Sequence, residues 1–457
     1  MNKKKNLLLL FSAIFLVNII IYFPCINAYF VNDDYNWIQP SRFLDVISSF
    51  WGGWGHGALY RPISRVLLYT EYLLFNSSPT GYHLVSLFLQ TCAVFIFFLF
   101  IKSLFSGKNL IVFLPLTVIF FYPHHEVICW ISSQTVLLST VFLFLSLLYI
   151  VKYLDDSLKY LKLFYSILFF ILGLMSYEMV VIAPLLIILI VFVKRDSRFL
   201  LKKSFLITAS SFIALTVIYL IYRKIVLAGL PEADAITFSL KNWLEDFLKL
   251  IKFQFFQNIF FLVLFLFSLI YTLLVTKDRK AVLFSLAWFF ICYIPFFFVN
   301  GYTGRFAYLS MFGILFLISL SIIQFYGNYK KFRAAVIIIF LAYIVFNGFK
   351  IYQNAGYWHE AGEIAQTIPL QLKSMHSTFP DNSTLIFYDI PLGYKQSGVF
   401  LTYFEDVIQR KYINKLNIIH VAHPFNKNFN DSLYKGKPNV YWFKFNPETR
   451  KLVEFHE

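Results

Sequence analysis

The sequence predicts an all-α, polytopic membrane protein that carries a small α/β or α+β domain outside the membrane. Hydrophobic residues make up 59% of the 457 positions and charged residues only 14%, whereas a soluble domain has roughly 25% charged residues. The mean hydropathy is +0.67. The 57 Phe and 30 Tyr residues suit contact with lipid chains and headgroups. This composition excludes a soluble globular protein, a disordered chain and a disulfide scaffold.

About eleven stretches are long and apolar enough to cross the roughly 30 Å of hydrocarbon in a bilayer. These predicted spans are 6–23, 84–101, 109–122, 132–151, 163–176, 179–193, 204–222, 256–275, 281–299, 305–325 and 334–349. The first stretch follows a basic start and could be a signal peptide, but its apolar core is longer than the usual ~7–15 residues. We therefore expect a retained membrane anchor there.

The net charge of +16 is explained by topology and requires no nucleic-acid partner. If Met1 is cytoplasmic and the chain alternates sides, the cytoplasmic connections hold nineteen Lys and Arg residues but only four Asp and Glu residues. This distribution obeys the positive-inside rule. We therefore predict a multi-pass membrane protein with its N-terminus in the cytoplasm and its C-terminal domain on the external side, which is periplasmic, extracellular or lumenal. A bacterial plasma membrane is the expected location.

Alternation leaves three substantial external segments, near 24–83, near 223–255 and after 350. The loop 24–83 carries several Trp and Tyr residues among apolar ones, with glycines between them, which is typical of helices lying in the membrane interface. In 238–256, charged residues interrupt apolar positions at helical spacing. Because the non-membrane chain is concentrated on one side, we expect the protein to work on the outer face.

After residue 350 the composition becomes that of a small soluble domain, so we divide the chain into a transmembrane domain, 1–349, and an external domain, 350–457. We expect a helix near 359–373. Pro and Gly residues separate the strand candidates that follow. These candidates are 384–388, 417–421 and 440–445.

Two motifs on the external side combine acids and histidines. Asp33 and Asp34 are adjacent carboxylates at a membrane boundary, where they are costly to desolvate unless they bind something; otherwise they cap a helix. His124, His125 and Glu126 lie outside the third predicted span. These three could equally be ordinary polar residues of the interface.

Three further charged residues are expected on the same side. Glu178 is a lone acid at a turn between two apolar runs, where it needs a partner if buried and none if exposed. Arg305 stands at the outer mouth of a predicted span, and Arg61 lies in the first external loop. Each arginine is either an anchor that reaches the headgroups or a ligand for an anionic group.

Carboxylates, imidazoles and arginines that converge at the outer leaflet suit the transfer of a sugar from a lipid phosphate. Arginines can hold the phosphate with two parallel hydrogen bonds. A carboxylate can deprotonate an acceptor hydroxyl as the hydroxyl attacks a sugar carbon. The departing lipid phosphate is then stabilised by the same arginines.

The ordered motifs resemble the GT-C membrane glycosyltransferases over roughly residues 5–320. They are most similar to the protein O-mannosyltransferase-like branch that includes the transmembrane and tetratricopeptide-repeat O-mannosyltransferases, without the repeat domain. In chain order they are Asp33-Asp34, Tyr60-Arg61-Pro62, Pro79-Thr80-Gly81-Tyr82-His83-Leu84, His124-His125-Glu126-Val127 with Trp130-Ile131-Ser132, Glu178-Met179, and Arg305-Phe306-Ala307-Tyr308-Leu309.

This resemblance implies a GT-C-like helical core and a donor sugar, mannose or similar, carried on a polyprenyl monophosphate. It implies that Asp33 is the base or orients the acceptor, with Asp34 and Glu126 as further catalytic residues. The substrate-binding residues that it implies are Arg61, His124, His125, Glu178, Arg305 and Tyr308. The doubled histidine leaves the register of the His-x-Glu motif open by one residue.

The chain also departs from the family's pattern. The relatives often carry a Lys before the acid that corresponds to Glu178, whereas this chain has Ser176-Tyr177 there, so one charge that would neutralise phosphate is missing. The C-terminal segment differs as well. The acceptor, which could be a protein, a lipid or a glycan, therefore cannot be inferred from the family.

Two other functions and a metal site remain open at this point. A transporter or flippase of a lipid-linked sugar is an alternative, although transporters show internal repeats and polar groups near the midplane. A non-catalytic scaffold is another. No cofactor is firmly predicted, but a divalent cation is possible because the acids and histidines of the motifs Asp33-Asp34 and His124-His125-Glu126 are suitable ligands.

Overall fold

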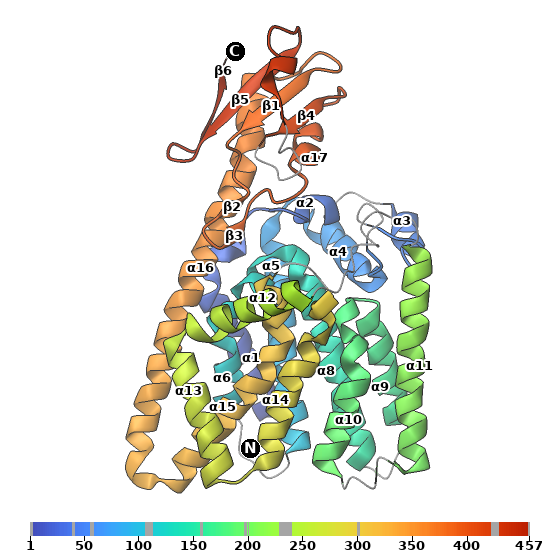
Figure 1. Cartoon of the computed structure of the whole chain (residues 1–457), viewed down its shortest axis with the longest axis vertical. Coiled ribbons are helices and arrows are strands. Elements are labelled where there is room, and N and C mark those ends of the chain that lie inside the picture. Colours follow the sequence, from blue (N-terminus) through green and yellow to red (C-terminus); the bar gives the residue numbers. More distant parts are fainter. Residues whose placement is uncertain are drawn as a thin grey trace.

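The computed structural model is a bundle of helices with a small β-sheet at one end (Figure 1). It describes residues 3–38, 42–54, 59–105, 113–155, 159–195, 199, 201–227, 240–298, 302–421 and 429–455. The bundle helices are α1 (Lys3–Ile21), α5 (Pro79–Leu104), α6 (Phe113–Ile119), α8 (Gln134–Asp155), α9 (Tyr160–Leu174), α10 (Ala183–Lys194), α11 (Lys203–Val226), α13 (Ile259–Ile270), α14 (Arg279–Tyr293), α15 (Tyr308–Asn328) and α16 (Arg333–Met375). Each of the eleven predicted apolar stretches overlaps one of these helices.

The prediction of a helical, multi-pass membrane protein is confirmed, and the number of spans stays a prediction. Within the described residues, seven helices are long and apolar enough to cross a membrane, or eight if one bent pair is counted as a span. Helices α6, α9 and α10 are shorter, with 7, 15 and 12 residues. Neighbouring helices must shield the ends of such short elements from lipid.

Helix α15 lies in the centre of the bundle. Every residue from Tyr308 to Ile322 is buried, and the helix packs against α14, α13 and α6. A helix that is apolar all round is suited to such a position. The 3-10 helix Gly304–Ala307 leads directly into α15, so that Arg305 lies at the outer end of the best-packed element of the fold.

Short helices cover the end of the bundle that lies nearest the sheet. They are α2 (Asp34–Trp37), α3 (Phe43–Ser48) and α4 (Pro62–Phe75), all from the first predicted external loop, and α12 (Leu240–Ile251), which lies across the bundle (Figure 1). The segment Leu240–Phe256 meets the next helix at 94°. Helices were predicted in both regions, and their location in a membrane interface stays a prediction.

The C-terminal part forms a cap around a four-stranded sheet at the same end. The strands are β1 (Thr384–Tyr388), β4 (Asn417–His420), β5 (Val440–Asn446) and β6 (Lys451–Phe455), in the order β4-β1-β5-β6. Strand β1 is parallel to β4 and β5, and β6 is antiparallel to β5. The three predicted strands are confirmed, whereas β6 was not predicted.

Two smaller elements complete the cap: α17 (Phe404–Gln409) and a hairpin of β2 (Gly393–Tyr394) and β3 (Ser397–Gly398). The 43 residues of α16 run from the bundle into the cap without a break and pass through the predicted domain boundary at 349–350. The helix predicted at 359–373 is the last part of α16. The boundary itself stays a prediction.

The first testable prediction concerns orientation. The N-terminus and the start of α11 lie at one end of the bundle, and the cap with the C-terminus lies at the other (Figure 1). Reporter fusions placed after Lys203 and after Glu457 should therefore report opposite sides of the membrane, with the Lys203 fusion in the cytoplasm as the positive-inside rule requires. Matching signals from the two fusions would overturn this topology and the external location of the site with it.

Candidate functional site

The two adjacent acids have different environments. Asn32 has a left-handed backbone (φ 47°) and begins a turn that separates the side chains that follow. Asp34 is only 1% exposed. Its carboxyl accepts hydrogen bonds from the Ser132 N–H (2.8 Å), the Ser132 hydroxyl (2.5 Å) and the Val31 N–H (3.1 Å). Asp33 is partly exposed and accepts a hydrogen bond from the Thr402 hydroxyl at 2.8 Å. Only Asp33 is free to meet a ligand.

Asp34 ties the first external loop to the start of α8. Burial raises the pKa of its carboxyl to about 7, against the effect of the hydrogen bonds from Ser132 and Val31. Between about pH 4 and pH 7 the folded protein therefore holds a proton that the unfolded chain has released. The contribution of Asp34 to the free energy of unfolding should fall over this range as pH rises. One pKa unit corresponds to about 1.4 kcal/mol.

Replacement of Asp34 by Asn should therefore change the pH dependence of stability. Asn does not titrate, so the difference in melting temperature, wild type minus Asp34→Asn, should fall as pH rises from about 5 to about 7. Glu71, whose pKa burial raises to about 8, titrates in both proteins and cancels in this difference. Identical pH slopes for the two proteins would contradict the role given to Asp34.

Asp33 lines a cavity of about 160 Å³ together with Arg61 and Arg305. We call this cavity the arginine pocket. Its remaining lining residues are Trp37, Leu59, Ser132, Ser133, Thr135, Val136 and Tyr177. The pocket thus brings together side chains from the segment between α1 and α5, from the turn before α8 and from the 3-10 helix that precedes α15. It combines one carboxylate with two guanidinium groups.

Arg61 is held in place by Glu178. Arg61 lies just before Pro62, the first residue of α4. Its Nε and Nη2 atoms donate hydrogen bonds to the two carboxylate oxygens of Glu178, at 2.9 and 2.7 Å. The guanidinium also lies 4.3 Å from the centre of the Tyr177 ring. Burial alone would raise the pKa of Glu178, but the Arg61 charge lowers it to about 2. Glu178 is therefore ionised and positions Arg61; it does not line the arginine pocket.

A second arginine, which the sequence analysis did not single out, also approaches Glu178. An Nη atom of Arg223, near the end of α11, lies 4.0 Å from a Glu178 carboxylate oxygen. Thus a positive charge from a distant helix is present beside the position where the family that the sequence resembles often carries a Lys. The sequence contains a signal for Arg223, because a basic residue at the predicted external end of a span departs from the positive-inside rule.

Arg305 is held by stacking. Its guanidinium lies 4.5 Å from the centre of the Trp130 ring, and within the described part of the chain no carboxylate lies within ion-pair distance of it. Since Arg61 already neutralises Glu178, the free charge of Arg305 makes the arginine pocket suitable for an anion. A planar guanidinium can bind two phosphate oxygens at once.

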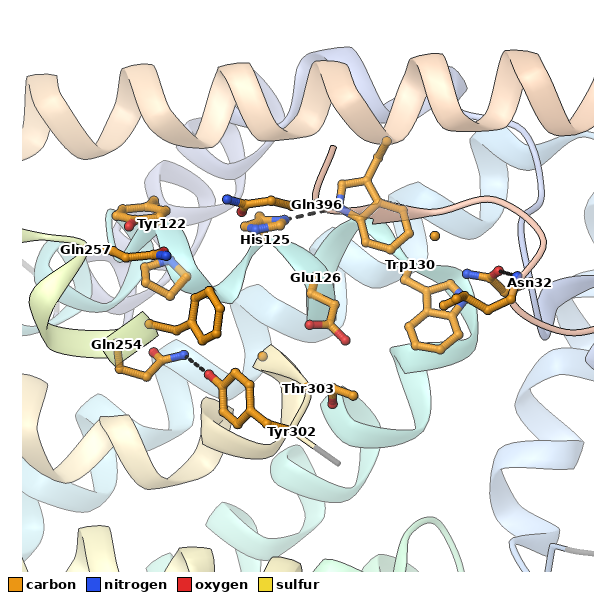
Figure 2. Close-up of a pocket in the computed structure, with 16 residues that line it drawn as sticks. Asn32, Tyr122, His125, Glu126, Trp130, Gln254, Gln257, Tyr302, Thr303 and Gln396 are labelled. Atoms are coloured by element: carbon orange, nitrogen blue, oxygen red, sulfur yellow. Dashed lines mark hydrogen bonds between the residues drawn. The ribbon is translucent and has the colours of Figure 1, made fainter. Parts of the chain in front are cut away.

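Glu126 and His125 line a second, larger cavity of about 320 Å³ (Figure 2). We call this the aromatic pocket, because five of its lining residues are Tyr, Trp or Phe. Burial raises the pKa of Glu126, while the charge of Arg305 and hydrogen bonds from the backbone of Gly304 and Arg305 lower it. A Cβ atom at position 304 would stand 2.7 Å from Glu126 Oε2. Only a glycine at 304 allows this close approach.

His125 is neutral in this environment. Burial lowers its pKa to about 4, and its Nδ1 atom accepts a hydrogen bond from the indole N–H of Trp358 at 3.1 Å (Figure 2). Nδ1 therefore carries no proton. His125 is a polar but uncharged group on the wall of the aromatic pocket.

The two pockets lie on either side of a shared wall. Asn32 lines the aromatic pocket and Asp33 the arginine pocket, and the same change of side occurs between Gly304 and Arg305. The turn before α8 contributes to both pockets as well. The segment that carries Asp33 therefore lies between the two pockets.

Two predicted substrate ligands lie elsewhere. His124 is 1% exposed, and its ring lies 4.6 Å from that of Tyr308 in the aromatic core. The Tyr308 hydroxyl donates a hydrogen bond to Gln90. Neither residue lines either pocket. The doubled histidine thus has one member in the core and one, His125, at a pocket, and we leave His124 and Tyr308 out of the site.

The geometry gives the possible divalent cation no ligand cluster. Among the described residues, no group of three or more His, Cys, Asp or Glu side chains could hold a metal ion. Asp34 is fully occupied by hydrogen bonds, and His124 lies in the core, so the candidate ligands do not converge. The requirement for a divalent cation stays an untested prediction.

Comparison with known proteins identifies the fold. The chain is similar to ArnT from Cupriavidus metallidurans, solved with bound undecaprenyl phosphate (TM-score 0.57, 13% identity, 97% of this chain and 93% of that one). It is also similar to the archaeal oligosaccharyltransferase AglB from Archaeoglobus fulgidus, solved with an inhibitory peptide and a dolichol-phosphate (TM-score 0.53, 12% identity, 100% of this chain and 74% of that one). No protein-family model and no curated sequence matches the chain.

These neighbours are glycosyltransferases of the GT-C type, and the likeness confirms the predicted fold class, a GT-C-like helical core with a small C-terminal sheet domain. The likeness does not distinguish the O-mannosyltransferase branch from others. That finer assignment stays a prediction.

Proposed function

We propose that the protein is a membrane glycosyltransferase that transfers a sugar from a polyprenyl-monophosphate donor to an acceptor hydroxyl on the outer face of the membrane. The observation that carries this proposal is the arginine pocket, in which the partly exposed carboxyl of Asp33 and the guanidinium groups of Arg61 and Arg305 line one small cavity. The ligands of the two structural neighbours, undecaprenyl phosphate and dolichol-phosphate, support the class of donor.

In this proposal the donor phosphate binds to the free fork of Arg305. Arg61 adds a second positive charge to the pocket, and its pairing with Glu178 fixes its orientation. Both charges are in place before the reaction, so they stabilise the phosphate as it gains negative charge without further rearrangement. The polyprenyl chain would lie along the membrane-facing helices.

Asp33 is the proposed general base. The acceptor hydroxyl oxygen attacks the anomeric carbon of the donor, the bond between that carbon and the phosphate oxygen breaks, and the hydroxyl proton passes to the Asp33 carboxylate. Polyprenyl phosphate leaves with the bonding electron pair. Asp34 does not touch the substrates; it holds the turn that carries Asp33 against Ser132. Mannose or a similar hexose is proposed as the sugar on the family resemblance alone.

A transporter of lipid-linked sugar is less consistent with these contacts. The ionisable groups of the site are gathered at one end of the bundle, whereas transporters place such groups near the midplane. A scaffold would not need an unpaired guanidinium beside a carboxylate. A glycosyltransferase accounts both for the grouping of the ionisable residues at one end and for the unpaired guanidinium.

The lipid that copurifies with the protein tests the class of donor. Mass spectrometry of lipids extracted from the purified protein should detect a polyprenyl phosphate or its glycosylated form in excess over its share of the membrane. The same lipid should be depleted from the Arg305→Ala protein, because that variant lacks the proposed phosphate ligand. Ordinary phospholipids alone, in both proteins, would count against a polyprenyl-phosphate donor.

A further inference from the structure

We propose that the aromatic pocket binds an uncharged saccharide and that this saccharide carries the acceptor hydroxyl. The inference rests on the function proposed above and goes beyond it, since it names the class of the acceptor. Three features of the pocket support it: the chemistry of its walls, its unpaired polar atoms and its position beside Asp33.

The walls combine aromatic faces with amide groups. Rings of Trp130, Tyr302 and Trp358 line the pocket, and so do the amides of Gln254, Gln257 and Gln396 (Figure 2). The C–H faces of a sugar ring pack on aromatic rings, and its hydroxyls donate and accept hydrogen bonds as amides do. The volume of about 320 Å³ is at the small end of the range for ligand pockets, roughly 300–1,000 Å³.

Several polar atoms of the wall have no partner within the protein. They are Gln254 Oε1, Thr303 Oγ1 and Trp130 Nε1, all buried and without a hydrogen bond to the described residues. Gln254 is only 2% exposed, and its amide N–H already donates to the Tyr302 hydroxyl at 2.9 Å. Buried polar groups without partners are rare in folded proteins. A ligand with hydroxyl groups can satisfy all three atoms.

The charges of the pocket argue against an anionic ligand. No Lys or Arg lines the aromatic pocket, whereas Arg61 and Arg305 line the arginine pocket. His125 accepts a hydrogen bond at Nδ1 and is uncharged, and the one acidic group is the carboxyl of Glu126. A phosphate or uronic acid would therefore meet the Glu126 carboxyl and no Lys or Arg side chain of the wall, in contrast to the arginine pocket.

The cap contributes one side of the aromatic pocket and joins it to the Asp33 segment. Gln396, Gly398 and Leu401 line the pocket from the cap. The Leu401 N–H donates to Asn32 Oδ1 at 2.8 Å, and the Asn32 N–H donates to the Val399 carbonyl at 3.0 Å. A Cβ atom at position 398 would stand 2.0 Å from the Asn32 amide nitrogen. A saccharide in this pocket therefore lies against the residue that precedes Asp33.

The test measures binding of defined probes to the full chain in nanodiscs. Trp130 and Trp358 line the pocket, so intrinsic tryptophan fluorescence reports its occupation. The probes are mannobiose, cellobiose and N,N′-diacetylchitobiose as neutral sugars, digalacturonic acid as an acidic sugar, and a Thr-containing hexapeptide. We expect saturable binding of at least one neutral disaccharide, and none of digalacturonic acid or the peptide.

Two variants and a control connect the signal to the pocket. Gln254→Leu and Gln396→Ala, on opposite sides of the pocket, should each weaken disaccharide binding by about tenfold, as expected when a hydrogen-bonding group is lost. Gln353→Leu, in α16 and outside both pockets, should bind as the wild type does. Saturable binding of the peptide or acidic sugar in place of every neutral disaccharide would overturn the proposal, as would wild-type affinity in both pocket variants.

Binding of polyprenyl phosphate is measured on the same samples. A wild type that binds a neutral disaccharide but no polyprenyl phosphate would overturn the proposed donor and leave the saccharide site standing. A wild type that binds polyprenyl phosphate but no neutral disaccharide would overturn only the saccharide site.

Discussion

Replacement of Asp33 by Asn should lower the rate of sugar transfer by about 10²–10⁴-fold, the usual contribution of a general base. Asn keeps the size of Asp and can still accept the hydrogen bond from the Thr402 hydroxyl, so the geometry of the turn survives. What is lost is the group that takes the acceptor proton. The measurement is turnover of a polyprenyl-phosphate sugar by the purified variant at saturating donor.

The stability of the variant and the behaviour of its neighbour provide the controls. The melting temperature of Asp33→Asn should stay near the wild-type value, because this side chain is partly exposed and makes one hydrogen bond. Asp34→Asn should reduce turnover less, since Asp34 acts only by holding the turn. Full activity in Asp33→Asn combined with loss of activity in Asp34→Asn would assign the base to Asp34. Full activity in both would refute the proposed mechanism.

Replacement of Arg305 by Ala should weaken binding of polyprenyl phosphate by about ten- to a hundredfold. A hydrogen bond to a charged group contributes roughly 1.5–3 kcal/mol, and no other guanidinium in the arginine pocket is free of a carboxylate partner. Arg305→Lys should fall between the wild type and Arg305→Ala, because Lys keeps the charge but not the planar fork. Titration of the donor lipid into detergent-solubilised protein measures the affinity of all three.

Arg333 supplies the matched control for this experiment. It lies at the opposite end of the bundle, where its Nε donates to the Tyr326 carbonyl at 3.0 Å. Arg333→Ala removes the same side chain from the first turn of α16 and should leave donor affinity unchanged. Wild-type affinity in Arg305→Ala would reduce Arg305 to a residue that stacks on Trp130. Equal losses in the Arg305 and Arg333 variants would point to a general effect on stability.

Local patterns predicted the elements of this fold well. The apolar stretches overlap helices, and the strands at 384–388 and 440–445 were predicted to within one residue. Helix and strand patterns are both contained in a few neighbouring side chains. The end of the membrane domain was harder to predict. Helix α16 continues across position 350 while its composition changes, since helical hydrogen bonds do not depend on whether the side chains face lipid or water.

The candidate site was predicted in part. Asp33, Arg61 and Arg305 line one pocket, and His125 and Glu126 line another; the roles that the ordered motifs imply for them stay predictions. The different environments of Asp33 and Asp34 could not be predicted, because they depend on a contact with Ser132 nearly a hundred residues away.

Three other features of the site also depend on long-range packing. Arg223 reaches Glu178 from a different helix, and the cap closes the aromatic pocket through Gln396 and Leu401. His124 and His125 are equivalent in the sequence, and only packing directs one into the core and the other to a pocket. No local pattern encodes such contacts.

Transfer from a defined donor tests the central claim most directly. Purified protein in liposomes is supplied with a radiolabelled mannosyl polyprenyl phosphate and a neutral disaccharide acceptor, and the water-soluble product is counted. Wild-type protein should release label into the soluble glycan with turnover, while an Asp33→Asn, Arg305→Ala double variant should not exceed protein-free liposomes. If wild-type protein and the double variant released label equally from a panel of polyprenyl-phosphate hexoses, or if neither released any, the protein would not be the glycosyltransferase proposed here.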